Sequence, residues 1–182
     1  MNFDDLYPTR FMKAGNLPVE KTTYTIKDIA KEQLQLDSGV EDKVVMSFEE
    51  TPMQLVLAKV NAVAIKSMFG GDVRDWLGKR LTLYATTEIM PFPKRRDEPC
   101  IRVYGSPDIE AEVICEWTPP KRRKLVQKLQ PTAFYYKCQK RIRDTPKEEL
   151  DTLPEKINEL VSSSQLTKKD GDELVALIAR RR

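Results

Sequence analysis

The stretch at residues 75–84 reads Asp-Trp-Leu-Gly-Lys-Arg-Leu-Thr-Leu-Tyr and joins a turn to an alternating strand. Successive side chains of a strand point to opposite faces of its sheet. The apolar set, which is expected to face a core, comprises Leu81, Leu83 and Ala85. The polar set on the other face comprises Arg80, Thr82, Tyr84 and Thr86. A cation, hydroxyls and an aromatic ring on one face are typical of sheets that bind a polyanion with stackable bases.

The segments on either side of this stretch show strand and helix patterns in turn. Alternating and β-branched residues predict strands at 18–33, 43–49, 55–57, 79–88 and 100–104, with a further candidate at 111–117. Helical spacing predicts a helix at 59–69, which Gly70 and Gly71 end. The order β-β-β-α-β-β predicts a mainly β fold with α, a five-stranded OB-like barrel. In such a barrel Trp76 is expected to be buried at one end.

Basic and acidic residues are unevenly distributed along the chain. Residues 1–118 carry 15 Lys and Arg against 19 Asp and Glu, a net charge of −4, whereas residues 119–182 carry 16 against 9, a net charge of +7. Prolines and consecutive cations predict a basic linker at 119–132. Apolar residues at three- and four-residue spacing then predict a helical hairpin or three-helix module at 133–182. An OB-like domain is expected at 1–118.

Several classes of site are excluded by what the chain lacks. It has no histidine, the commonest general base and transition-metal ligand. Its cysteines, Cys100, Cys115 and Cys138, lack the CxxC spacing of a zinc site, and no GxxxxGK[ST] or GxGxxG motif is present. We therefore expect no enzyme activity, no metal and no other cofactor. Without a membrane-spanning apolar run or a secretory signal, a cytoplasmic protein with no membrane contact is expected.

Five segments of the first domain, at 7–14, 44–49, 55–62, 75–84 and 100–103, share their order and character with a known group. The most specific is Asp-Trp-x-Gly-Lys at 75–79. Together they resemble small tailed-phage proteins that are suspected to be OB-fold single-stranded DNA-binding proteins of replication or recombination. The resemblance implies the same fold and ligand for this chain, in the cytoplasm of a bacterial host.

The rest of the chain matches that group less closely. Residues 135–182 resemble the helical tails of several phage recombination proteins. Ala58 stands where the group often has Asn, so any role of that amide is absent here. The chain ends in three arginines, at 180–182, instead of the acidic tip of bacterial single-strand-binding proteins. Recruitment of host partners by such a tip is therefore not implied.

Three groups of residues are candidates for contact with nucleic acid. The sheet-face group is Arg80, Thr82, Tyr84, Arg102 and Tyr104. The loop group is Phe92, Lys94, Arg95 and Arg96. The basic-linker group is Lys121, Arg122, Arg123 and Lys124. Rings would stack on bases and cations would contact phosphates. The structural alternatives are a solvated sheet face, a clamp on the end of the barrel and a solvated linker.

Two functions remain open at this point. The first is sequence-independent binding of single-stranded DNA or RNA. The second is a protein-interaction module that binds no nucleic acid and docks through its C-terminal helices on a replication, recombination or host-defence protein. The net charge of −4 over residues 1–118 favours the second function, because binding to a polyanion is assisted by positive charge. Either function is compatible with a homo-oligomer.

Overall fold

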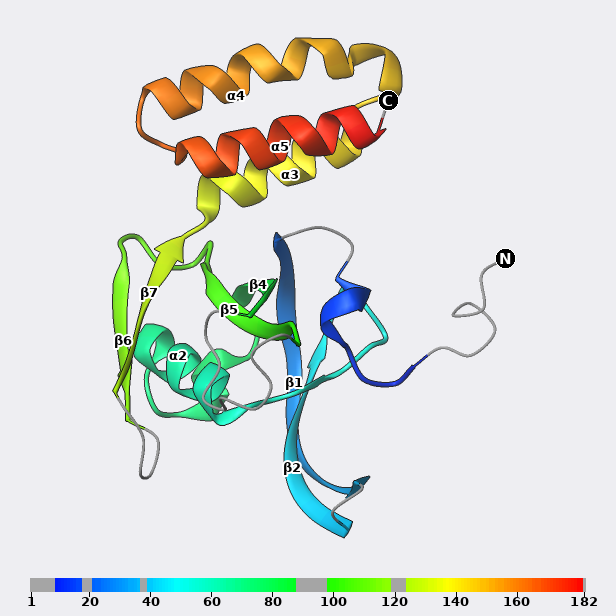
Figure 1. The fold of residues 1–182 in the computed structure, drawn as a ribbon, viewed down its shortest axis with the longest axis vertical. Helices are drawn as coiled ribbons and strands as arrows, with labels where there is room; N and C mark the ends of the chain where they lie inside the picture. The colour runs from blue at the N-terminus through cyan, green and yellow to red at the C-terminus, as the bar shows by residue number, and fades with distance from the viewer. Residues whose placement is uncertain (1–8, 18–20, 37–38, 88–97, 119–123, 182) are drawn as a thin grey trace. The chain divides into compact units, whose positions relative to one another are not determined.

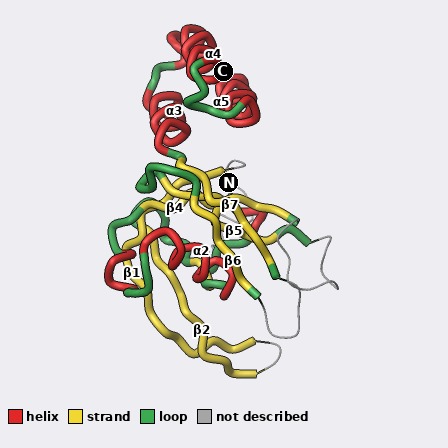
Figure 2. The backbone as a smooth tube through the Cα atoms, turned by 90° about the vertical axis from the view of Figure 1, so that its left-hand side faces the viewer, coloured by secondary structure: helices red, strands yellow, loops and turns green. Residues whose placement is uncertain are grey.

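The computed structural model describes residues 9–17, 21–36, 39–87, 98–118 and 124–181 (Figure 1). The chain divides into two compact units between Pro131 and Thr132. The first unit is built on a β-sheet and the second is helical (Figure 2). A β-rich fold with helices at its C-terminal end is therefore confirmed. Within the described ranges, no helix is long and apolar enough to cross a membrane.

The first unit contains one sheet with the strand order β3-β2-β1-β4-β5-β7-β6. Its strands are β1 (Lys21–Leu36), β2 (Gly39–Phe48), β3 (Leu55–Val56), β4 (Arg80–Thr86), β5 (Cys100–Ser106), β6 (Val113–Trp117) and β7 (Leu125–Pro131). Neighbouring strands are antiparallel except β5 and β7, which are parallel. Strand β6 confirms the candidate strand at 111–117.

The predicted five-stranded barrel is wrong, because the sheet is open and has seven strands. Strand β5 uses one edge to pair with β4 and the other to pair with β7, where Gly105 lies opposite Gln130. The β6–β7 hairpin then extends the sheet beyond β5. Strands β3 and β6 consequently form the two ends of the sheet.

Strand β1 is 16 residues long and belongs to two pairings. Residues 21–25 pair with β4, and from Ile26 onward the strand pairs with β2. The register shifts between Ile26 and Asp28, which is the signature of a bulge. The strands predicted at 18–33 and 43–49 are confirmed as β1 and β2, which pair as an antiparallel hairpin. The first part of β1 is thereby placed beside β4, where the candidate site lies.

The core of the first unit lies between the sheet and helix α2 (Lys59–Phe69). Fully buried side chains from both include Ile26, Met46, Ile65, Leu81, Leu83 and Leu129. Helix α2 matches the predicted range 59–69 and contacts β5, β6 and β7. At about 25 cal/mol per Å² of apolar surface, such residues supply most of the stabilisation of the unit.

The turn of the opening stretch is structural, as predicted for Trp76. This residue ends the short 3₁₀ helix η2 (Val73–Trp76) and is buried. Its indole Nε1 donates to the carbonyl oxygen of Gly70 at 3.0 Å, which ties the turn to the end of α2. Gly78 follows with φ of +75°, a conformation that glycine adopts without a steric penalty. The chain then enters β4.

The second unit is the predicted helical module. It comprises α3 (Ala133–Asp144), the 3₁₀ helix η4 (Lys147–Thr152), α4 (Leu153–Ser162) and α5 (Lys168–Arg181). A further short 3₁₀ helix, η1 (Ala14–Asn16), lies in the first unit and is not part of this module. The core of the module includes Tyr135, Ile142, Leu150, Leu153, Ile157, Leu174 and Ile178. Its helices present apolar residues at the spacing that the sequence showed.

The predicted linker at 119–132 is wrong over its second half, because residues 125–131 form β7. In this strand Val126 and Lys128 are exposed whereas Leu129 is fully buried. This is the alternation of a half-buried strand. The dense cations around it made the segment look like a solvated linker. Residues 119–123 lie outside the described residues.

Candidate nucleic-acid interface

The polar face of strands β1, β4 and β5 brings part of the sheet-face group together. In the strand register Lys21 lies opposite Tyr84, and Tyr84 lies opposite Arg102. These three residues form one row across three adjacent strands. Tyr104 joins the row from β5, and we refer to Lys21, Tyr84, Arg102 and Tyr104 as the cross-strand cluster. It contains two cations and two phenol rings.

The rings and cations of the cross-strand cluster contact one another. The ring centroids of Tyr84 and Tyr104 are 5.4 Å apart with an interplanar angle of 78°, an edge-to-face pair. The Lys21 Nζ lies 4.4 Å from the centroid of the Tyr104 ring, within the range of a cation–π interaction. The cluster is therefore held by direct contacts between its members as well as by the strands.

The four residues of the cross-strand cluster differ in their exposure to solvent. Lys21 is 3% exposed and Arg102 is 5% exposed, whereas Tyr84 and Tyr104 are half-buried. Burial lowers the pKa of the Arg102 guanidinium, which donates through Nη1 to the carbonyl oxygen of Ile101 at 2.9 Å. An arginine nevertheless remains charged at neutral pH. The accessible parts of the cluster are the two rings, with the two cations close to them.

The expectation that the whole polar face points into solvent is wrong for Thr82 and Arg102. Thr82 is fully buried, and its hydroxyl shares a 2.9 Å hydrogen bond with the hydroxyl of Thr23. Thr23 lies opposite Thr82 because residues 21–25 of β1 pair along β4. The two threonines are therefore buried side by side on this face. Thr82 is structural in this position and cannot contact a ligand directly.

Arg80 is held by an ion pair with Asp108. Its backbone N–H donates to Asp108 Oδ2 at 2.7 Å and its Nε donates to Oδ1 at 2.9 Å, while Nη2 also contacts Oδ1. Two guanidinium nitrogens thus share Oδ1 while the backbone N–H donates to Oδ2, which fixes the guanidinium and neutralises its charge. Burial alone would raise the pKa of Asp108, but the hydrogen bonds and charge of Arg80 lower it below the ordinary value. Arg80 is thus a weaker phosphate ligand than the sequence suggested.

The Arg80–Asp108 pair predicts a pH-dependent stability. Asp108→Asn is expected to lower the free energy of unfolding by about 1 kcal/mol at neutral pH, since the pair is only partly shielded from water. Because the folded-state pKa of Asp108 is depressed, this contribution is fully present above the unfolded value of 3.8, declines as pH falls below that value and is lost once pH falls through the folded-state pKa. Urea denaturation at pH 7 and near pH 3 measures the difference between the two proteins.

The control for this prediction is Glu116→Gln, which breaks an exposed pair with Lys124. Exposed pairs contribute little, so this variant is expected to unfold like the wild type at both pH values. A difference between Asp108→Asn and wild type that is the same at pH 7 and pH 3 would contradict the assigned role of Asp108.

The basic-linker group is only partly described. Lys121, Arg122 and Arg123 lie outside the described residues, as do Phe92, Lys94, Arg95 and Arg96 of the loop group. Lys124 is described, and its Nζ lies 2.6 Å from Glu116 Oε2. Lys128 of β7 is similarly 3.1 Å from Glu112. Both cations are therefore neutralised by glutamates, so Lys124 does not belong to a purely basic surface.

Lys21 and Thr23 are the site residues that the sequence reasoning missed. The signal was present, because Lys21, Thr23 and Thr25 alternate with Thr22, Tyr24 and Ile26. The first set shares the face of Arg80, Thr82 and Tyr84, and the second faces the core. An alternation test applied to the predicted strand at 18–33 would have assigned Lys21 to the polar face.

Among the residues that the structure describes, no group of three His, Cys, Asp or Glu side chains could hold a metal ion. Cys100, Cys115 and Cys138 are free thiols, and burial raises the pKa of Cys100 and Cys138. No family model, curated protein or solved structure matches this chain. Function must therefore be inferred from the site itself.

Proposed function

We propose that the protein binds single-stranded nucleic acid without sequence preference, on the polar face of β1, β4 and β5. The observation that carries the proposal is the cross-strand cluster, in which two cations adjoin two half-buried tyrosine rings. Every base has a π face, so stacking on Tyr84 and Tyr104 would tolerate any sequence. Lys21 and Arg102 would attract the phosphates.

The burial of the two cations is compatible with this role. Water screens a charge less when the charge is removed from solvent, so its field at a nearby phosphate is stronger. Lys21 and Arg102 flank Tyr84 in the same row, and a strand stacked on that ring would run between them. The rings would then position the bases, while the two cations would attract the neighbouring phosphates over a short distance.

The connectivity of the sheet supports a relation to the OB fold. Strand β1 pairs with both β2 and β4, β3 follows β2, and α2 lies between β3 and β4 in the chain. We propose that β1–β5 with α2 form an OB-like substructure, opened and extended by β6 and β7. A role in phage replication or recombination is part of the proposal and rests on the segment resemblance alone.

A salt titration of binding to fluorescent oligo-dT tests the proposed function. Lys21 and Arg102 are buried, so they would act on nearby phosphates through their field rather than by direct contact. At about 0.7 per neutralised phosphate of a single strand, log K is expected to fall with log salt with a slope no steeper than about −1.4 between about 50 and 200 mM. Duplex DNA of the same length is expected to bind more weakly, because its bases are not available for stacking. Fluorescence anisotropy of the full chain provides both measurements.

Lys21→Met is the matched variant, because it keeps an unbranched side chain and removes the charge. It is expected to reduce the slope by up to about 0.7, the contribution of one neutralised phosphate of a single strand. Lys59→Met, at the exposed start of α2, is expected to leave the slope unchanged. Absence of oligo-dT binding at low salt, or equal affinity for duplex, overturns the proposed function.

A further inference from the structure

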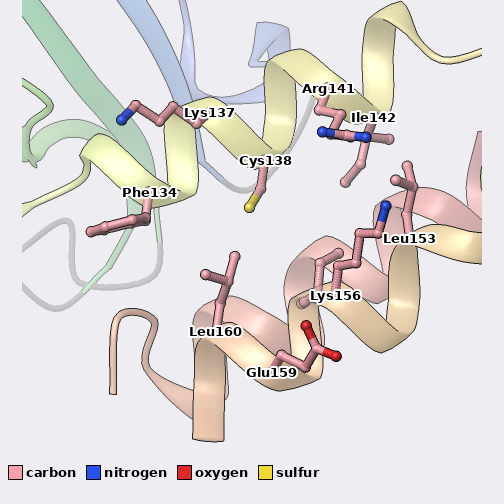
Figure 3. Close-up of a pocket in the computed structure, with 10 residues that line it drawn as sticks. Phe134, Lys137, Cys138, Arg141, Ile142, Leu153, Lys156, Glu159 and Leu160 are labelled. Atoms are coloured by element: carbon pink, nitrogen blue, oxygen red, sulfur yellow. The ribbon is translucent and has the colours of Figure 1, made fainter. Parts of the chain in front are cut away.

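The helical module contains a groove between α3 and α4. Its volume is about 390 Å³. The apolar residues that line it are Phe134, Cys138, Ile142, Leu153, Ile157 and Leu160. In Figure 3 the side chains of Cys138 and Leu160 point toward each other across the groove, and Phe134 lies at one end.

Cations dominate the polar residues around this groove. Lys137 and Arg141 come from α3 and Lys156 comes from α4, whereas Glu159 is the only acidic residue in the lining. All four residues are exposed. A second hollow at the end of α3 is lined by Lys137, Lys140, Arg141, Asp144 and Thr145, so three cations and one carboxylate border it. The groove thus combines an apolar floor with a positively charged border.

Phe134 is an apolar side chain of the groove that is exposed to solvent. It is a large apolar residue that is 40% exposed, and the Lys137 Nζ lies 5.5 Å from the centroid of its ring. Neighbouring groove residues such as Ile142 and Leu153 are almost fully buried. An exposed ring beside a groove and a cation is a typical anchor point for a partner side chain.

We propose that this groove binds an acidic amphipathic helix of a partner protein. An amphipathic helix places apolar side chains at i, i+3, i+4 and i+7 into a groove, and its carboxylates would face Lys137, Arg141 and Lys156. A nucleic acid would match the cations but not the apolar floor formed by Cys138, Ile142 and Leu160. Charge and apolar surface together therefore favour a peptide. The proposal does not depend on the function of the sheet.

A labelled synthetic helical peptide with Leu and Phe on one face and Glu on the other tests this proposal by anisotropy with the full chain. We expect it to bind, whereas a peptide with Lys in place of Glu and a peptide with Ser in place of Leu and Phe do not. Arg141→Glu combined with Lys156→Glu is expected to weaken binding at least about tenfold. The matched control is Lys169→Glu, an exposed cation of α5 that lines neither the groove nor the second hollow.

Cys138 supplies an independent readout of occupancy. Its thiol lines the groove, so the bound peptide is expected to slow its alkylation, as measured by peptide mapping, while Cys100 of the sheet reacts at an unchanged rate. Equal binding of the Ser peptide, or no effect of the double charge reversal, overturns the proposal. If oligo-dT displaces the peptide, the groove binds nucleic acid and the proposal is overturned. If the chain forms a dimer that Phe134→Ala abolishes, the groove binds a second copy of the chain and the proposal is likewise overturned.

Discussion

Gly105→Ala is expected to lower the free energy of unfolding by about 3 kcal/mol, at the upper end of the range for overpacking. A Cβ at this position would lie 1.9 Å from the carbonyl oxygen of Gln130 and 2.6 Å from its nitrogen. Both atoms belong to the backbone, so no rotamer change relieves the clash. Gly105 opposite Gln130 is one of the two residue pairs that join β5 to β7. Urea denaturation followed by circular dichroism measures the loss.

The control is Gly71→Ala. Its nearest atom to a new Cβ is Lys66 Cε at 3.8 Å, an ordinary contact with a flexible side chain, so this variant is expected to unfold like the wild type. If Gly105→Ala has no larger effect than Gly71→Ala, the parallel contact of β5 with β7 is not formed in solution. Hydrogen exchange at the end of β7 that pairs with β5 would then be as fast in the wild type as in Gly105→Ala.

The elements that the sequence predicted well are those with a strong local period. The helix at 59–69 and the strand beginning near residue 79 have spacings that local sterics and burial determine. The role of Trp76 followed from its size and from the glycine two residues later. In each case the decisive interactions lie within a few residues of the chain.

The features that the sequence did not predict depend on non-local pairing. No local pattern shows that Gly105 meets Gln130, so the extension of the sheet by β7 and β6 was missed and a closed barrel was expected. The neutralisation of Arg80 likewise depends on Asp108, 28 residues further along. Charge alone therefore overstated the accessible cationic surface.

The largest effect on the proposed binding is expected at the two rings of the cross-strand cluster. Tyr84→Leu and Tyr104→Leu keep apolar bulk but remove the aromatic face. Because stacking contributes about 1–3 kcal/mol per base, each variant is expected to weaken oligo-dT binding roughly 5- to 150-fold at constant salt. The salt slope is expected to stay unchanged, since no cation is removed. Anisotropy titrations of the full chain measure both quantities.

Phenylalanine variants separate stacking from the other roles of these tyrosines. Tyr84→Phe and Tyr104→Phe keep the ring and are expected to bind oligo-dT within about twofold of the wild type. The two rings are 5.4 Å apart, so the double leucine variant is expected to lose less than the sum of the single losses. Thermal unfolding of each variant controls for lost packing. If the leucine and phenylalanine variants bind equally well, the rings do not stack on bases, and the affinity arises from charge alone.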